Sequence, residues 1–197
     1  MCRSIVVTAI LGGLLAAPLA AQGANKQQAL DPNVQNQLWP SRKLSPAETD
    51  FKDRVVAMRD TIIALQATVE QADRARRTRN SPAVLASQSR VTGVSCARVE
   101  RNAAELRSFA AGLSTNNERF GEPAIERFRT AIDDLHRTMG ACAADLDRLV
   151  GNGPDKLDPD KVLDVLNAVR TATANYSKAA EGLAKTLNIR IEATDKS

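Results

Sequence analysis

The sequence predicts an all-α protein: an antiparallel up-down-up-down four-helix bundle that follows a signal peptide and an extended N-terminal arm. Two observations carry the prediction of the bundle. Four long stretches each begin at a proline and carry apolar residues spaced alternately by three and four, which is the period of one helix face. No stretch alternates apolar and polar residues with the period of two that is typical of a strand.

Residues 1–23 have the pattern of a secretory signal peptide. Arg3 supplies the positive start, residues 5–17 are uncharged and mostly apolar, and small residues then offer cleavage after Ala21 or Gly23. An uncleaved anchor is the alternative, but the apolar run is short and is interrupted by two glycines and a proline. We therefore expect a periplasmic or secreted protein with no transmembrane span in the mature chain.

The segment 24–44 is predicted to be an extended or disordered arm. It is rich in Gln and Asn, it contains Pro32 and Pro40, and it shows no helical period. Trp39, the only tryptophan, is predicted to dock the arm on the bundle, with binding of a partner as the alternative. At the other end, residues 191–197 are predicted to form a flexible tail.

The bundle itself is predicted over residues 45–190. Ser45, Ser81 and Asp158 each precede a proline and are favourable N-cap residues. Glu48 would complete a capping box with Ser45. The short connections make successive helices antiparallel neighbours. The helices are expected at about 46–77, 82–114, 123–150 and 159–189.

Each predicted helix has a core-facing stripe of apolar and small residues. The first stripe is Phe51, Val55, Met58, Ile62, Leu65, Val69 and Ala72, and the second is Leu85, Ser89, Thr92, Cys96, Val99, Ala103, Leu106, Ala110 and Leu113. The third is Ile125, Phe128, Ile132, Leu135, Met139, Cys142, Leu146 and Leu149, and the fourth is Val162, Leu166, Val169, Thr173, Tyr176, Ala180, Leu183 and Leu187.

Cys96 and Cys142 are the two cysteines that remain when the leader, with Cys2, is removed. If the second and third helices fold back about a turn near residue 119, both cysteines lie at one level of the bundle. This predicts a disulfide, which would stabilise the fold by about 4 kcal/mol in the chain-entropy model. Two free buried thiols are the alternative that a reducing compartment would favour. Redox catalysis is not expected, because a catalytic thiol needs exposure and a lowered pKa.

His136 is the only histidine, with Asp133 one turn before it and Met139 one turn after it. The chain has neither the Glu-x-x-His pairs of di-iron bundles nor the Cys-x-x-Cys-His motif of covalent haem. A non-covalent haem held by His136 with Met58 or Met139 is the alternative to a partly exposed helical histidine, which we prefer. We predict no cofactor, no metal ligand and no catalytic residue.

The overall charge also excludes some functions. The formal net charge is +4 and falls to about +3 when Arg3 leaves with the leader. This is too small an excess to indicate nucleic-acid binding.

A Ser-His-Asp arrangement is not visible either, since the only histidine lies in mid-helix and no strained nucleophile turn is apparent. We therefore do not expect an enzyme.

The strongest charge feature is the arginine run at the end of the first predicted helix, formed by Arg74, Arg76, Arg77 and Arg79. Cations at a helix C-terminus complement the helix dipole, which is one explanation. The other is a patch that binds an anionic envelope component or an acidic partner. The antiparallel bundle is expected to bring five acidic residues to the same end, where they would neutralise part of this charge: Asp145, Asp147, Asp155, Asp158 and Asp160.

The function that these features favour is an exported, non-enzymatic helical-bundle protein that acts as a binding, adaptor or envelope-associated module. The alternative is a small-ligand or haem/metal carrier that uses the bundle core. The core-facing stripes are dominated by Leu, Val, Ile and Ala and offer no polar constellation to orient a ligand, which favours the first interpretation.

Overall fold

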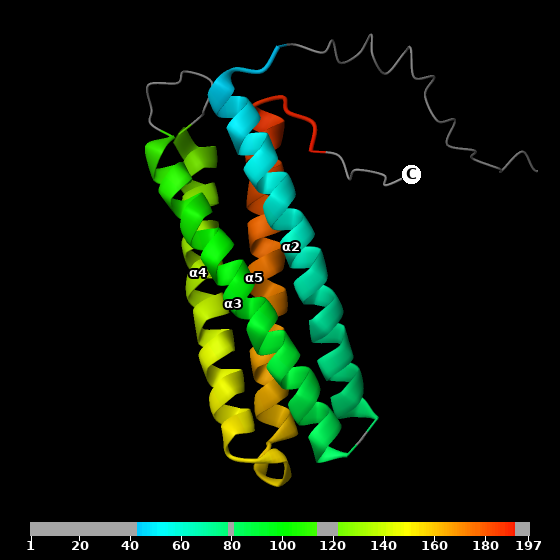
Figure 1. Cartoon of the computed structure of the whole chain (residues 1–197). Helices are drawn as coiled ribbons and strands as arrows, with labels where there is room; N and C mark the ends of the chain where they lie inside the picture. Colours follow the sequence, from blue (N-terminus) through cyan, green and yellow to red (C-terminus); the bar gives the residue numbers. More distant parts are fainter. Residues whose placement is uncertain (1–42, 79–80, 114–121, 192–197) are drawn as a thin grey trace, which may run out of the picture. The chain divides into compact units, whose positions relative to one another are not determined.

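A computed structural model describes residues 43–78, 81–113 and 122–191, and all regular structure in this part is helical. Four long helices lie side by side (Figure 1), which confirms the prediction of an all-α four-helix protein. Their bounds differ from the predicted ones by three residues or fewer. In chain order the elements are α2 (Pro46–Arg77), α3 (Pro82–Gly112), α4 (Glu122–Gly151), the short 3-10 helix η1 (Pro154–Lys156) and α5 (Pro159–Thr186).

Several predictions concern residues outside the described part. They are the signal peptide, the arm up to residue 42 with Trp39, Arg79, and the tail from residue 192. Among the described helices, none combines the length and apolar character that crossing a membrane requires.

All three predicted N-cap residues occupy the N-cap positions, and two of them cap their helix through the side chain. The N–H of Ser45 donates to Glu48 Oε2 (2.8 Å) and the N–H of Glu48 donates to Ser45 Oγ (3.3 Å), which is the predicted capping box. Asp158 Oδ1 accepts from two backbone N–H groups of the first turn of α5. Ser81 also occupies the N-cap position of α3, as predicted, but its exposed side chain makes no capping hydrogen bond. Instead, the backbone carbonyl of Ser81 accepts a hydrogen bond from the N–H of Val84 in the first turn of α3 (2.9 Å).

Helix α5 ends three residues before its predicted end because of a C-terminal cap. Asn188 has a φ of 53°, in the left-handed region that Asn tolerates better than most residues. Its N–H donates to the carbonyl of Lys185 (3.0 Å), and the N–H of Ile189 donates to the carbonyl of Ala184 (2.8 Å). These two bonds form a Schellman motif, which satisfies the last carbonyls and turns the chain out of the helix.

The core follows the predicted stripes with one exception. Every predicted stripe residue is buried except Leu149, which is half-buried, while Val150 is only 2 % exposed. The reason is geometric, because a helix of 3.6 residues per turn drifts away from a strict spacing of three and four. At one level of the core, the ring of Phe128 lies 5.4 Å from that of Phe51 and 6.1 Å from that of Tyr176, measured between centroids.

The helices pack unequally on one another. Helix α3 packs most extensively on α4, whereas α2 and α5 make a much smaller interface. Side-chain contacts place α3 against α4 at two levels. Arg129 of α4 donates to the carbonyls of Ala110 (3.0 Å) and Leu113 (2.9 Å) at the end of α3, and Cys96 lies against Cys142 further along both helices.

Candidate anion-binding site between α2 and α5

A buried carboxylate on α2 collects three arginines. Asp73 is only 3 % exposed. Its Oδ1 accepts from Nε (3.2 Å) and Nη2 (3.0 Å) of Arg76. Its Oδ2 accepts from Nη2 of Arg77 (2.7 Å) and from Nη2 of Arg170 (2.9 Å). These four residues are called the arginine cluster below.

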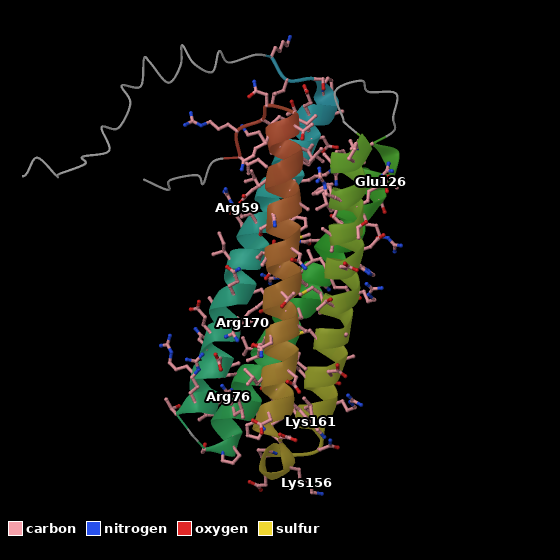
Figure 2. The ribbon with its side chains drawn as sticks, turned by 180° about the vertical axis from the view of Figure 1, so that it is seen from behind. Arg59, Arg76, Glu126, Lys156, Lys161 and Arg170 are labelled. Atoms are coloured by element: carbon pink, nitrogen blue, oxygen red, sulfur yellow. A yellow bond between two sulfur atoms is a disulfide. The ribbon has the colours of Figure 1, made fainter. Side chains whose placement is uncertain are left out.

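The cluster combines a local pattern with a contact between helices. Arg76 and Arg77 follow Asp73 by three and four residues, which places them on the same helix face as the carboxylate. Arg170 comes from α5, 97 positions later in the sequence. Figure 2 shows Arg170 and Arg76 close together along the α2–α5 side of the molecule. The cluster therefore joins the two neighbouring long helices that share the smallest interface.

The arginines fix the ionisation of the carboxylate. Burial by itself would raise the pKa of Asp73, but the hydrogen bonds from Arg77, Arg170 and Arg76 outweigh burial and lower that pKa to about 2. Asp73 is therefore ionised at neutral pH. Three guanidinium groups face one carboxylate, so the cluster retains two positive charges in excess.

The excess charge lies on the solvent side of the cluster. The side chain of Arg76 is 20 % exposed, that of Arg170 is 38 % exposed and that of Arg77 is 70 % exposed. Arg170 is further held by Nη1, which donates to Oδ1 of Asn167 one turn earlier on α5 (3.1 Å). The buried carboxylate thus sits beneath arginines that a solute can reach.

The acidic residues that were expected to neutralise the arginine run do not do so. Asp145 pairs with Arg148 on its own helix (2.7 Å), and Asp158 caps α5 and lies 4.0 Å from Lys161. In the described part of the chain, no ion pair joins an arginine of α2 to any of the five expected partners: Asp145, Asp147, Asp155, Asp158 and Asp160. Asp145 and Asp158 have partners on their own helices, and Asp73 is the carboxylate that pairs with Arg76 and Arg77.

The four arginines predicted as a patch therefore have different environments. Arg76 and Arg77 belong to the cluster, and Arg79 lies outside the described residues. Arg74 is exposed, and its side chain makes no hydrogen bond or ion pair within the described ranges. Sequence reasoning missed Asp73 and Arg170. The spacing of Asp73 to the following arginines was a usable signal, whereas Arg170 required the register of α5 against α2.

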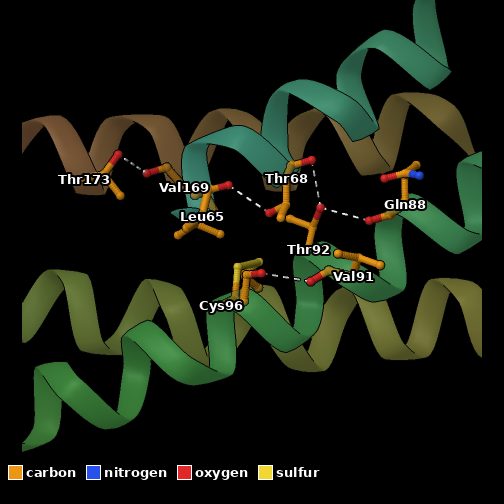
Figure 3. Close-up of a disulfide and its surroundings, with 10 residues drawn as sticks. Leu65, Thr68, Gln88, Val91, Thr92, Cys96, Val169 and Thr173 are labelled. Carbon is orange, nitrogen blue, oxygen red and sulfur yellow. Dashed lines mark hydrogen bonds between the residues drawn. A yellow bond between two sulfur atoms is a disulfide. The ribbon is translucent and has the colours of Figure 1, made fainter. Parts of the chain in front are cut away.

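The structure also places Cys96 and Cys142 at disulfide distance, with their Cα atoms 6.1 Å apart and both side chains buried (Figure 3). A small neighbour helps α3 to approach α4 here. A Cβ added to Gly93 would lie 3.6 Å from Cβ of Leu146. These contacts belong to the α3–α4 interface, whereas the arginine cluster joins α2 to α5.

The surroundings of His136 give little support to a haem or metal site. His136 is partly exposed, whereas Met58 and Met139 are buried in the core. Asp133 is paired with Arg107 of α3 (2.6 Å). Among the residues that the structure describes, no group of three or more His, Cys, Asp or Glu side chains is arranged to hold a metal ion.

Comparison of the chain with protein-family models, curated proteins and solved structures finds no match.

Proposed function

We propose that the chain is an exported, non-enzymatic, antiparallel up-down-up-down four-helix bundle that binds an anionic component of the cell envelope. The observation that carries this proposal is the excess positive charge of the arginine cluster: within the described residues, Asp73 is the one carboxylate that forms ion pairs with its three arginines. Arginine is well suited to binding carboxylate and phosphate groups because its planar fork offers several donors to one anion.

Pairs of contacts support the antiparallel arrangement. Thr92 donates to the carbonyl of Thr68, while Asn102, later on α3, donates to Thr61, earlier on α2. The two α3–α4 contacts run in the same sense, since Cys96 meets Cys142 and Ala110 meets Arg129. Short connections join such neighbours most simply.

Export is supported by two features that agree. The leader pattern of residues 1–23 predicts secretion, and the pairing of Cys96 with Cys142 suits an oxidising compartment. Disulfides are rare in proteins of the reducing cytosol, so a stable bridge fits the periplasm or the cell exterior.

Neither of the two groups with a displaced pKa in the described part of the chain suits general acid–base catalysis. Asp73 is held ionised by its arginines, and burial raises the pKa of the Tyr176 hydroxyl. A general acid or base works best with a pKa near the working pH, and neither shift moves a group in that direction. The alternative of a carrier has less support. Three large aromatic side chains, Phe51, Phe128 and Tyr176, contact one another inside the bundle and fill the space that a ligand would need.

Co-sedimentation with the native envelope fraction tests the proposal. The variant R76E/R77E should sediment much less than the wild type, because it reverses two charges of the arginine cluster. The control R137E/R148E reverses two exposed arginines of α4 that also pair with an aspartate three residues earlier, Asp134 and Asp145. It should behave like the wild type. Equal binding by R76E/R77E and the control would contradict the proposed binding site, and recovery of the protein in the cytosolic fraction would contradict export.

A further inference from the structure

We propose that the arginine cluster is a preorganised site for a phosphate group, in which Asp73 is a positioning residue and the three arginines bind the anion. The inference deepens the proposed function and rests on it, since it names the chemistry of the anionic partner. Three observations carry it: the unused donors of the arginines, the amount of excess charge, and the burial of the carboxylate.

The arginines have donors left over after they bind Asp73. A guanidinium group carries five N–H donors. Arg77 uses Nη2 for Asp73, which leaves its Nε and Nη1 without a partner among the described residues. Arg76 uses Nε and Nη2, which leaves Nη1, and Arg170 keeps its Nε. An anion above the cluster can therefore accept from two helices at once.

The excess charge matches a phosphate monoester. The cluster carries two positive charges beyond those that Asp73 neutralises. A phosphate monoester carries about −1.5 to −2 near neutral pH, and its three terminal oxygens can accept from several guanidinium groups together. A single carboxylate would leave one positive charge uncompensated. Phosphate is therefore the anion that this cluster fits better.

Asp73 holds the three arginines together in one binding site. Without a negative charge between them, the guanidinium groups would repel one another. The carboxylate is almost fully buried and bonds to all three guanidinium groups. It holds them near one another before any ligand arrives, so a ligand does not have to order three long side chains. Arg170 is fixed a second time by Asn167. Preorganisation of this kind increases affinity.

This role gives an unusual expectation for the variant D73N. The change removes one negative charge, so simple attraction of anions by a basic surface would become stronger. A positioned site would become weaker, since the guanidinium groups lose the carboxylate that holds them. The sign of the change in affinity therefore separates the two explanations.

Two probes distinguish two sources of the phosphate group, a soluble compound and a lipid headgroup. The first is inorganic phosphate, measured by isothermal titration calorimetry at low ionic strength, where charge interactions are least screened. The second is vesicles that contain phosphatidic acid, whose headgroup is a phosphate monoester, compared with phosphatidylglycerol vesicles of the same charge density. Binding to the first indicates a soluble phosphate, and binding to phosphatidic acid alone indicates a lipid headgroup.

We expect D73N and R170Q each to weaken binding of the responding probe by about five-fold or more. The control R148Q removes the same charge as R170Q from an exposed arginine that is paired only within α4. It should change the affinity less than about two-fold. Far-ultraviolet circular dichroism at the working temperature shows whether each variant is folded. If D73N is not, the comparison of R170Q with R148Q replaces it.

Three results would overturn the inference: equal or tighter binding by folded D73N, equal losses in R170Q and R148Q, or no binding of either probe by the wild type. Each can occur while R76E/R77E still loses its binding to the envelope fraction. The proposed function would then stand and only the phosphate site would fall.

Discussion

Two interfaces of the bundle are built in different ways. The α3–α4 interface is extensive and apolar, it allows close approach at Gly93, and it places Cys96 against Cys142. The α2–α5 interface is small and contains the buried ion cluster of Asp73. Arg59, labelled further along the α2–α5 side in Figure 2, has a buried Nε with no hydrogen-bond partner within the described part.

The two interfaces are suited to different roles. Apolar packing and a disulfide hold helices together efficiently, whereas a buried ion pair must first offset the desolvation of its charges. A cluster with three arginines for one carboxylate is a poor choice for stability alone. We therefore interpret the α3–α4 interface as the part that holds the fold and the α2–α5 interface as the part that presents charge.

The largest expected effect lies in the α3–α4 interface. The double variant C96S/C142S should lose about 4 kcal/mol of unfolding free energy, because its unfolded chain is no longer restricted by the closed loop. Urea unfolding followed by circular dichroism measures the change. Wild-type protein treated with a reducing agent serves as the control and should show a similar loss. If reduction leaves the unfolding midpoint unchanged, the two cysteines do not form a stabilising bridge.

The next effect belongs to Asp73 and depends on pH. The pKa of Asp73 is about 2 in the folded protein and close to 4 in an unfolded chain, so the folded state favours the ionised form. This stability is present above pH 4 and is lost as the pH falls toward 2. It amounts to roughly 2 kcal/mol.

Urea unfolding at pH 6, 4, 3 and 2 checks this expectation. The wild type should lose roughly 2 kcal/mol more than D73N over this range, since the variant has no carboxylate to protonate at position 73. Parallel pH profiles of the two proteins would show that the arginines do not stabilise the charged form of Asp73.

A smaller effect tests how closely α3 approaches α4. The variant G93L should destabilise the fold by about 1–2 kcal/mol, because atoms beyond Cβ would be forced against Leu146 and the carbonyl of Ala143. The matched variant G182L adds the same side chain to α5 where a Cβ meets nothing within 4 Å. It should be tolerated. Similar thermal midpoints for G93L and G182L would contradict the close approach.

The smallest effect is a gain. Gly182 lies inside α5, where glycine is less favourable than alanine by about 0.8–1 kcal/mol. Because a Cβ at this position meets open space, G182A should raise the unfolding free energy by about 0.5–1 kcal/mol without disturbing the packing. Thermal unfolding of G182A beside the wild type measures it. A loss of stability would mean that this face of α5 is covered in solution.

Most of the fold could be predicted because helix packing leaves a period in the sequence. The stripes of apolar residues identified the core, and the level of Cys96 and Cys142 followed from the register of two helices. The errors lie where one residue decides a detail. Leu149 and Val150 are both apolar, so only the accumulated drift of the helix decides which of them is buried. Asn188 ends α5 through its backbone conformation, which the spacing of apolar residues does not reveal.

The candidate site was predictable only in part. The arginine run is visible in the sequence, and the i+3 and i+4 spacing of Arg76 and Arg77 to Asp73 is a local signal. Aspartates far along the chain were expected instead, but Asp145 is satisfied by a partner on its own helix. Arg170 joins Asp73 through the pairing of α2 with α5, which depends on tertiary packing and not on local sequence.

The division of roles between the two interfaces is the central claim, and one measurement tests it most directly. The affinity for the responding phosphate probe is compared between D73N and C96S/C142S, both at a temperature where each is folded. We predict that C96S/C142S, although far less stable, binds like the wild type, while D73N binds about five-fold or more weakly despite its added positive charge. Weaker binding by C96S/C142S together with unchanged binding by D73N would contradict the account.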